Sequence, residues 1–209
     1  YTMMKILESG TKYLASSGVS ELPETALERV YILTGPQSAG DWEKTDMPFD
    51  RVVVTDEDEI IKALTAGTFT RGSLVVIDDM MSRFKNRKFI MALIHHFSVS
   101  THRNDLWTFV LTQDYFHGDS TTWRRNAQNV MLFKSNKRGV NDLFQNLVPK
   151  TEIPLLMRMY KEATDQNFGA LTIMQYKPQA KMVFYSRLEG LFVQGIKENE
   201  KLVVTPVTT

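Results

Sequence analysis

The chain contains no cysteine, which excludes a disulfide framework and any zinc or redox site built on thiolates. It also lacks an apolar run of about 18 residues, the shortest that reads as a membrane-spanning helix. No secretory signal pattern opens it, and it shows neither an internal repeat nor a low-complexity segment. The absence of cysteine is compatible with a reducing compartment.

An excess of charge of one sign is also missing, because 25 basic and 24 acidic side chains leave a net charge of +1. Any contact with nucleic acid therefore has to come from a local basic patch and not from a global field. The 209 residues and the hydrophobic content of 43% favour one soluble globular domain over residues 1–209. Because the chain begins at Tyr1 and not at Met, we expect a processed or truncated product.

Apolar periodicity predicts helices alternating with strands along most of the chain. This alternation predicts an α/β fold with a largely parallel sheet covered by helices on both faces. Residues 35–41 read as a loop because of their glycines and proline, and Thr55 is the expected N-cap of the helix at residues 58–66. The expected helices span residues 2–14, 58–66, 84–97, 140–147 and 155–163, and the expected strands span 29–34, 51–55, 73–79, 106–112, 129–134, 170–175, 181–185 and 191–193.

Two adjacent carboxylates, Asp78 and Asp79, end the fully apolar strand predicted at residues 73–79. Acidic side chains at the carboxyl end of a buried strand are the arrangement with which phosphoryl-transfer ATPases hold Mg²⁺ and prime a water. In that interpretation Asp78 binds Mg²⁺ directly or through water, and Asp79 accepts a proton from the attacking water or orients it. The alternative is that the pair only favours the start of the following helix.

Gln113 follows the next predicted strand, after a separation that accommodates one crossover helix between parallel neighbours. An amide at that position can reach a γ-phosphate or its attacking water and report hydrolysis to the rest of the fold. The alternative is an ordinary polar strand end.

Three arginines are candidates for contact with phosphate, because the guanidinium group donates paired hydrogen bonds and keeps its charge. Arg124 and Arg125 precede the strand predicted at residues 129–134, and Arg138 follows it. In ring ATPases such an arginine can act across a subunit boundary on the neighbour's transition state. The sequence does not choose among the three, and a solvated surface role is the alternative.

A basic cluster, defined as Arg83, Lys85, Arg87 and Lys88, comes just after the two carboxylates. These four side chains can neutralise DNA phosphates, which is the sequence-independent contact that a translocase requires. Charge runs of this kind are also common on solvated helix faces that bind nothing.

These motifs together resemble the ATPase core of the FtsK and HerA superfamily. The resemblance is carried by residues 73–79, by Thr112-Gln113, and by Arg125-Asn126 followed by an apolar strand and Lys134-Ser135-Asn136. Within that superfamily the chain looks like the genome-packaging ATPases of large double-stranded DNA viruses and their virophage and transposon relatives. The likeness covers residues 1–150, and residues 151–209 are expected to complete the domain.

The resemblance implies a RecA-like P-loop NTPase sheet, mostly parallel and flanked by helices, that uses ATP and Mg²⁺. It implies that copies of the chain assemble into a ring, a hexamer or a pentamer, and move duplex DNA into a preformed capsid. Capsid vertex proteins would then be partners, and the protein would occur in the virion or inside the infected host cell. Family roles place Mg²⁺ on Asp78, the catalytic carboxylate of the Walker B motif on Asp79, and the γ-phosphate sensor on Gln113.

One departure from the family concerns the phosphate-binding loop, Gly-x-x-x-x-Gly-Lys-Ser/Thr, which the 209 residues do not contain. Residues 35–40 have its glycine spacing, but Asp41 and Trp42 stand where lysine and a hydroxyl residue are required. This segment also follows the wrong strand, since in the family the loop precedes the first helix. We therefore expect the missing strand and loop immediately before Tyr1, and poor stability without them because neighbouring strands would be unpaired.

Three other readings stay open from the sequence. A filamentous-phage assembly ATPase shares the carboxylate strand and the sensor but acts in protein export, and a membrane segment elsewhere in the parent protein would favour it. A terminase-type motor requires a nuclease domain with clustered acidic residues, which does not appear before Thr209. The third alternative is not an enzyme: the chain would be a degenerate domain that binds a partner without catalysis.

Overall fold

The computed structural model of the chain describes residues 29–47, 49–113, 126–127, 129–147, 150–165, 169–176, 181–185, 193–198 and 201–206. By its contacts the chain divides into two compact units, Tyr1–Asn126 and Ala127–Thr209. The expectation of a single domain over residues 1–209 stays a prediction. The helix expected at residues 2–14 lies outside the described residues.

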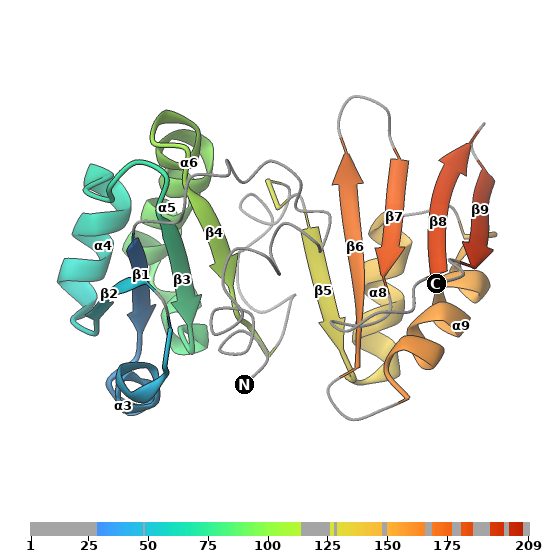
Figure 1. Cartoon of the computed structure of the whole chain (residues 1–209), viewed down its shortest axis with the longest axis horizontal. Coiled ribbons are helices and arrows are strands. Elements are labelled where there is room, and N and C mark those ends of the chain that lie inside the picture. The colour runs from blue at the N-terminus through green and yellow to red at the C-terminus, as the bar shows by residue number, and fades with distance from the viewer. Residues whose placement is uncertain are drawn as a thin grey trace. The chain divides into compact units, whose positions relative to one another are not determined.

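In the described part of the first unit, four strands form one parallel sheet in the order β2-β1-β3-β4 (Figure 1). This confirms the α/β class and, for this unit, the parallel sheet with flanking helices. Strands β1 and β3 have neighbours on both sides, and most of their residues are apolar and buried, as expected for central strands of a parallel sheet. The elements are β1 (Arg29–Thr34), α3 (Pro36–Lys44), β2 (Asp50–Val54), α4 (Glu57–Ala66), β3 (Leu74–Asp78), the 3₁₀-helix η1 (Met81–Lys85), α5 (Arg87–His95), the π-helical turn η2 (His96–Ser100), α6 (Thr101–Arg103) and β4 (Trp107–Val110).

The core of this unit lies between one face of the sheet and helices α4 and α5. Side chains on a strand alternate between faces, so Val75 and Ile77 of β3 point to the face that these helices cover. Burial of such side chains contributes about 1.5–3 kcal/mol each relative to exposure. The buried residues of this cluster are Leu33, Ile60, Leu64, Phe69, Val75, Ile77, Met80, Phe84, Phe89, Ile90, Ala92, Leu93, Phe97 and Leu106.

Local signals fix the ends of helices α4 and α5. The N-cap of α4 is Asp56 and not the expected Thr55, because the Asp56 carboxylate accepts a hydrogen bond from the Glu59 amide at 2.9 Å. The helix ends at Gly67, as predicted, with the left-handed φ of 63° that glycine adopts without steric cost. Helix α5 begins after Asn86, whose side chain accepts from the Lys88 amide at 2.9 Å.

Residues 35–41 form the start of a helix, so the prediction of a loop there was wrong. Helix α3 begins directly after Gly35, with Pro36 in its first turn. Proline is favoured at this position because its φ is already helical and its missing amide hydrogen would have no partner. The Gly-Pro pair therefore marks a helix start and not a loop.

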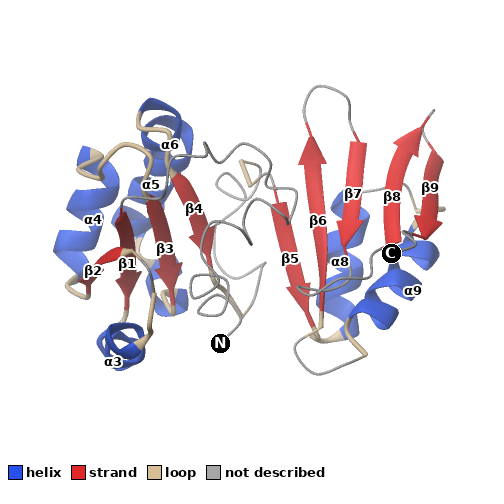
Figure 2. Ribbon diagram, viewed as in Figure 1, coloured by secondary structure: helices blue, strands red, loops and turns tan. Residues whose placement is uncertain are grey.

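The second unit contains antiparallel strands, where the sequence led us to expect a largely parallel sheet. Strands β5, β6 and β7 form one sheet, and β8 pairs with β9 (Figure 2). The few residues between β6 and β7 and between β8 and β9 explain these two pairings, because parallel neighbours need a crossover connection of a dozen or more residues. The elements are β5 (Asn129–Phe133), α8 (Lys137–Leu147), α9 (Ile153–Ala163), β6 (Ala170–Tyr176), β7 (Lys181–Tyr185), β8 (Val193–Glu198) and β9 (Lys201–Pro206).

Helices α8 and α9 pack on β6 through a second apolar cluster. Phe144 of α8 and Leu156 of α9 are fully buried there, beside Leu171 and Ile173 of β6. At the edge of this cluster the Tyr160 hydroxyl donates to the Phe133 carbonyl oxygen at 3.0 Å and accepts from the Ser135 amide at 2.6 Å. These two bonds fix the turn that leads from β5 into α8.

Candidate active site

The two carboxylates lie at the carboxyl edge of the parallel sheet. Asp78 is the last residue of β3 and is in register with Thr34, the last residue of β1. Helix α3 lies beyond the arrowhead of β1, at the edge where β3 and β4 also end (Figure 1). Open α/β sheets bind their ligands at this edge, so the position of the pair agrees with a site.

Asp79 has a left-handed backbone conformation with a φ of 53°. Such angles are uncommon outside glycine, although Asp and Asn adopt them more readily than other residues. Among the described residues Asp105 is the other non-glycine with a positive φ, at 48°. Backbone conformations of this kind occur preferentially at functional sites, and at Asp79 the turn directs the chain away from the end of β3.

Helix α3 contacts both carboxylates. The Trp42 indole Nε1 donates to Asp78 Oδ2 at 2.7 Å, and the Ser38 hydroxyl donates to Asp79 Oδ2 at 3.1 Å. A methyl group added at Gly35 would lie 4.0 Å from Asp79 Oδ2. The start of α3 is therefore beside the Asp79 carboxylate, where the positive end of the helix dipole favours negative charge.

The two carboxylates at this edge can supply part of the ligand set of Mg²⁺, with the remaining ligands coming from other oxygen atoms. No group of three or more His, Asp or Glu side chains that could hold a metal alone occurs among the described residues. Mg²⁺, however, is usually held by one or two carboxylates together with water and substrate phosphates. The Thr34 hydroxyl, in register with Asp78, is fully buried and lacks a partner in the described part of the chain. Water bound to a cation can satisfy such a hydroxyl.

Gln113 lies at the same edge, three residues beyond the end of β4. Strand β4 is the parallel neighbour of β3, as the sequence predicted, and the Leu111 amide extends their ladder by donating to the Ile77 carbonyl at 2.8 Å. The Thr112 hydroxyl then contacts Met81 Sδ at 2.9 Å. The chain after β4 is thereby held against the chain after the carboxylates, and the Gln113 side chain is exposed.

The start of α3 does not present the free amide groups with which a phosphate-binding loop holds phosphate. Pro36 has no amide hydrogen, and the Ser38 amide already donates to the Gly35 carbonyl at 3.1 Å. The Asp79 carboxylate accepts from Ser38 at the same helix end. A phosphate at that position would meet this negative charge.

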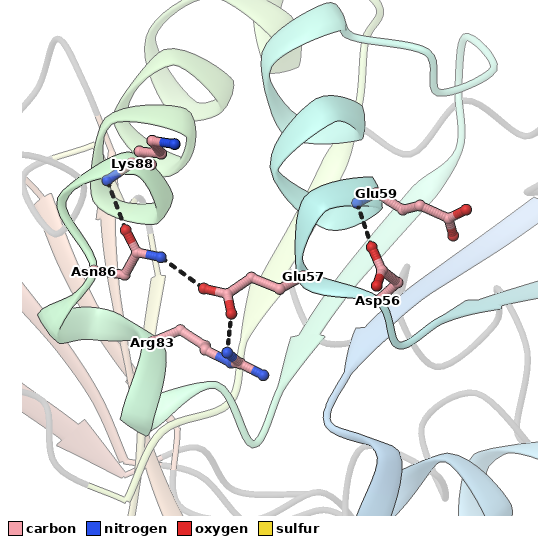
Figure 3. A network of polar contacts seen from close by, with 6 residues as sticks. All are labelled: Asp56, Glu57, Glu59, Arg83, Asn86 and Lys88. Atoms are coloured by element: carbon pink, nitrogen blue, oxygen red, sulfur yellow. Dashed lines mark hydrogen bonds and ion pairs between the residues drawn. The ribbon is translucent and has the colours of Figure 1, made fainter.

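The basic cluster divides into one paired and three exposed side chains, and Figure 3 shows the paired one, Arg83, beside Glu57. Arg83, on η1, forms an ion pair with Glu57 of α4 and is 36% exposed. Lys85, Arg87 and Lys88 are exposed at the end of η1 and in the first turn of α5. Because the charge of Arg83 is already compensated, these three residues are the better candidates for phosphate contacts.

Of the three candidate arginines, the structure describes Arg138. Arg138 is exposed in the first turn of α8, in the second unit. Arg124 and Arg125 lie outside the described residues.

Comparison with known proteins gives no family assignment. No protein-family model, no curated protein and no solved structure matches the chain. In the part of the chain that the structure describes, no helix is long and apolar enough to cross a membrane.

Trp42 and Ser38 are site residues that the sequence analysis missed. Ser38 lies in the segment that was predicted as a loop. Trp42 was considered only as a residue that departs from the phosphate-binding loop. A proline after glycine, followed by several residues without another proline, is the signal that predicts a helix start here. The position of helix α3 beside the ends of β1 and β3 depends on tertiary packing, which the sequence of this segment alone does not determine.

Proposed function

We propose that the chain is the core of an ATPase that moves double-stranded DNA, of the genome-packaging type in the FtsK and HerA superfamily. The observation that carries the proposal is the adjacent, parallel pairing of β3 and β4. This pairing directs the Asp78-Asp79 pair and Gln113 to one edge of the sheet. The RecA-like identity of the fold is part of the proposal, and the parallel four-stranded sheet with flanking helices is compatible with it.

Each of the three residues has a separate role in hydrolysis. Asp78, which accepts a hydrogen bond from Trp42, holds Mg²⁺ directly or through water. Asp79 orients the attacking water and takes its proton, a role that contributes typically 10²–10⁴-fold to rate. Gln113, after the neighbouring strand, is the sensor that contacts the γ-phosphate or its attacking water. Bound Mg²⁺ supplies charge neutralisation at the phosphate oxygens.

Binding of the ATP triphosphate requires groups outside these 209 residues. The phosphate-binding loop does not occur in them, and the start of α3 faces a carboxylate. The proposal therefore assigns the triphosphate to groups that these 209 residues do not include. It assigns stabilisation of transition-state charge to Arg124, Arg125 or Arg138 of a neighbouring copy in a ring.

Lys85, Arg87 and Lys88 provide the contact with DNA in this account. They follow Asp79 by a few residues, and the contacts of Met81 and Arg83 hold the intervening segment in place. Phosphate contacts of this kind carry no sequence information, which suits a motor that moves any duplex. The capsid partner, the ring of five or six copies, and the location in a virion or infected cell rest on the family resemblance.

ATP hydrolysis by the complete gene product, measured with and without duplex DNA, tests the proposal. A translocase is expected to hydrolyse ATP slowly alone and faster when long duplex DNA is added. Protein without added nucleic acid and protein with single-stranded DNA of equal nucleotide concentration are the controls. Absence of hydrolysis under all conditions would reject the ATPase, and hydrolysis that duplex DNA never changes would reject the translocase.

A further inference from the structure

The Trp42 indole is fixed in its position beside Asp78. Trp42 is 1% exposed and belongs to the second turn of α3. Its Nε1 donates to Asp78 Oδ2 at 2.7 Å, a length typical of a bond to a charged acceptor. An indole N–H donates and cannot accept, so this contact holds Asp78 Oδ2 as an acceptor in one orientation.

Contacts from β2 hold the end of α3 that carries Trp42. Arg51 Nη1 donates to the Trp42 carbonyl oxygen at 2.9 Å and also to the Thr45 carbonyl oxygen. Placing a guanidinium at a helix C-terminus satisfies carbonyls that have no helical partner and favours the helix dipole. The Thr45 hydroxyl adds a bond to the Asp41 carbonyl at 2.8 Å. A continuous set of contacts thus runs from β2 through α3 to the tip of β3.

We propose that Trp42 is a positioning residue that holds the Asp78 carboxylate in the orientation required to bind a divalent cation. The indole bond takes Oδ2, and we assign the cation to Oδ1. This inference rests on the proposed function, since it concerns the same cation site. Hydrogen bonds to a ligating carboxylate fix its direction, and removing such a partner typically weakens metal binding 10–100-fold.

Trp42→Phe is the variant that isolates the indole N–H, because it keeps an aromatic ring in the buried position. Trp107→Phe is the matched control, since Trp107 is a half-buried tryptophan in the same unit, on β4. The complete protein is titrated with Mn²⁺ in the presence of saturating ADP, and bound Mn²⁺ is measured by electron paramagnetic resonance. Thermal unfolding of both variants checks that they fold.

The dissociation constant for Mn²⁺ is expected to rise about tenfold or more in Trp42→Phe and to stay unchanged in Trp107→Phe. The Mg²⁺ concentration that gives half-maximal hydrolysis should rise by the same factor. Wild-type affinity in a folded Trp42→Phe protein would overturn the positioning role while the proposed function stands. Absence of Mn²⁺ binding by the wild-type protein would instead overturn both.

A second measurement needs no substitution at Trp42 and covers the case in which Trp42→Phe fails to fold. Because the indole contacts the ligand carboxylate directly, Mg²⁺ binding should change the tryptophan emission of the wild-type protein. Asp78→Asn should abolish that change. Emission that Mg²⁺ leaves unaltered in the wild-type protein, under conditions where Mn²⁺ binds, would overturn the proposal.

Discussion

Arg83 and Glu57 form an ion pair that connects the segment after the carboxylates to the first turn of α4 (Figure 3). The second oxygen of Glu57 accepts from Asn86 Nδ2 at 2.7 Å. Asn86 is itself the N-cap of α5 through the Lys88 amide. One carboxylate thereby fixes η1 and the start of α5, the two elements that carry the exposed basic residues.

Glu57→Ala is expected to lower the free energy of unfolding by about 1–2 kcal/mol, because it leaves two partly buried donors without their acceptor. The loss is smaller than that for a fully buried pair, since Glu57 is 25% and Arg83 36% exposed. Urea unfolding measures the difference. Glu59→Ala is the control, because the Glu59 side chain is exposed and points away from the network (Figure 3). Equal effects of the two substitutions would contradict the role of Glu57.

Replacing Lys85, Arg87 and Lys88 together by glutamine is expected to abolish DNA stimulation while basal ATP hydrolysis stays intact. Each lost phosphate contact reduces the magnitude of the slope of log K against log salt by about 0.9. The slope of the triple variant should therefore be smaller in magnitude by up to roughly 2.7. Binding to duplex DNA at several salt concentrations measures the slope.

Lys62, Arg158 and Lys161 form a control set of the same composition, since all three are exposed on helices elsewhere in the chain. Their joint replacement should leave the slope and the stimulation unchanged. If DNA stimulation is unchanged in the Lys85, Arg87 and Lys88 variant, these residues do not contact DNA and are ordinary solvated surface residues.

Strand positions in the first unit were the part of the fold that the sequence predicted best. The strand over residues 29–34 has the predicted bounds, and β2, β3 and β4 lie within two residues of theirs. These strands are short apolar runs between turn residues, so their pattern carries most of the information. In the order β2-β1-β3-β4, strands β3 and β4 end side by side. Asp79 and Gln113 therefore follow at the carboxyl edge, where open α/β sheets bind their ligands.

The end of the chain was predicted less well. The strand expected at residues 191–193 begins only at Val193 and runs to Glu198, and the strand from Lys201 to Pro206 was missed. Polar, glycine and charged residues interrupt β8, so its apolar pattern is weak, whereas the apolar run Leu202-Val203-Val204 of β9 is only three residues long. Helix 84–97 was also predicted as one element, whereas η1, α5 and η2 divide it, since periodicity does not distinguish tighter from wider helical turns.

His96 gives the chain a pH-dependent stability. It is fully buried and pairs through Nε2 with the Thr108 hydroxyl at 2.8 Å. Burial and, to a smaller extent, repulsion from His95 lower the pKa of His96 from 6.5 to about 4. Since the unfolded chain then binds more protons than the folded one between pH 6.5 and 4, stability should be complete above pH 6.5 and decrease as the pH falls.

The loss below pH 4 is expected to be about 3 kcal/mol, from 1.36 kcal/mol per pKa unit. Urea unfolding from pH 7.5 to 4 measures it. His96→Gln, which keeps a polar partner for Thr108 but does not titrate in this range, should show a flatter profile than the wild-type protein. His102→Gln is the control at an exposed histidine and should keep the wild-type profile. An identical pH profile for His96→Gln would refute this account.

The most direct test of the proposed catalytic site is ATP hydrolysis by the complete protein with Asp79→Asn, compared with Asp105→Asn. Asparagine tolerates the left-handed backbone of both positions, so each variant removes one carboxylate and keeps the turn. Asp105 precedes β4, at the opposite edge of the sheet, and is paired with Arg71 on the surface. We predict that Asp79→Asn lowers the rate at least about 100-fold and that Asp105→Asn keeps it. Undiminished hydrolysis by Asp79→Asn would contradict the assignment of this carboxylate and, with it, the proposed active site.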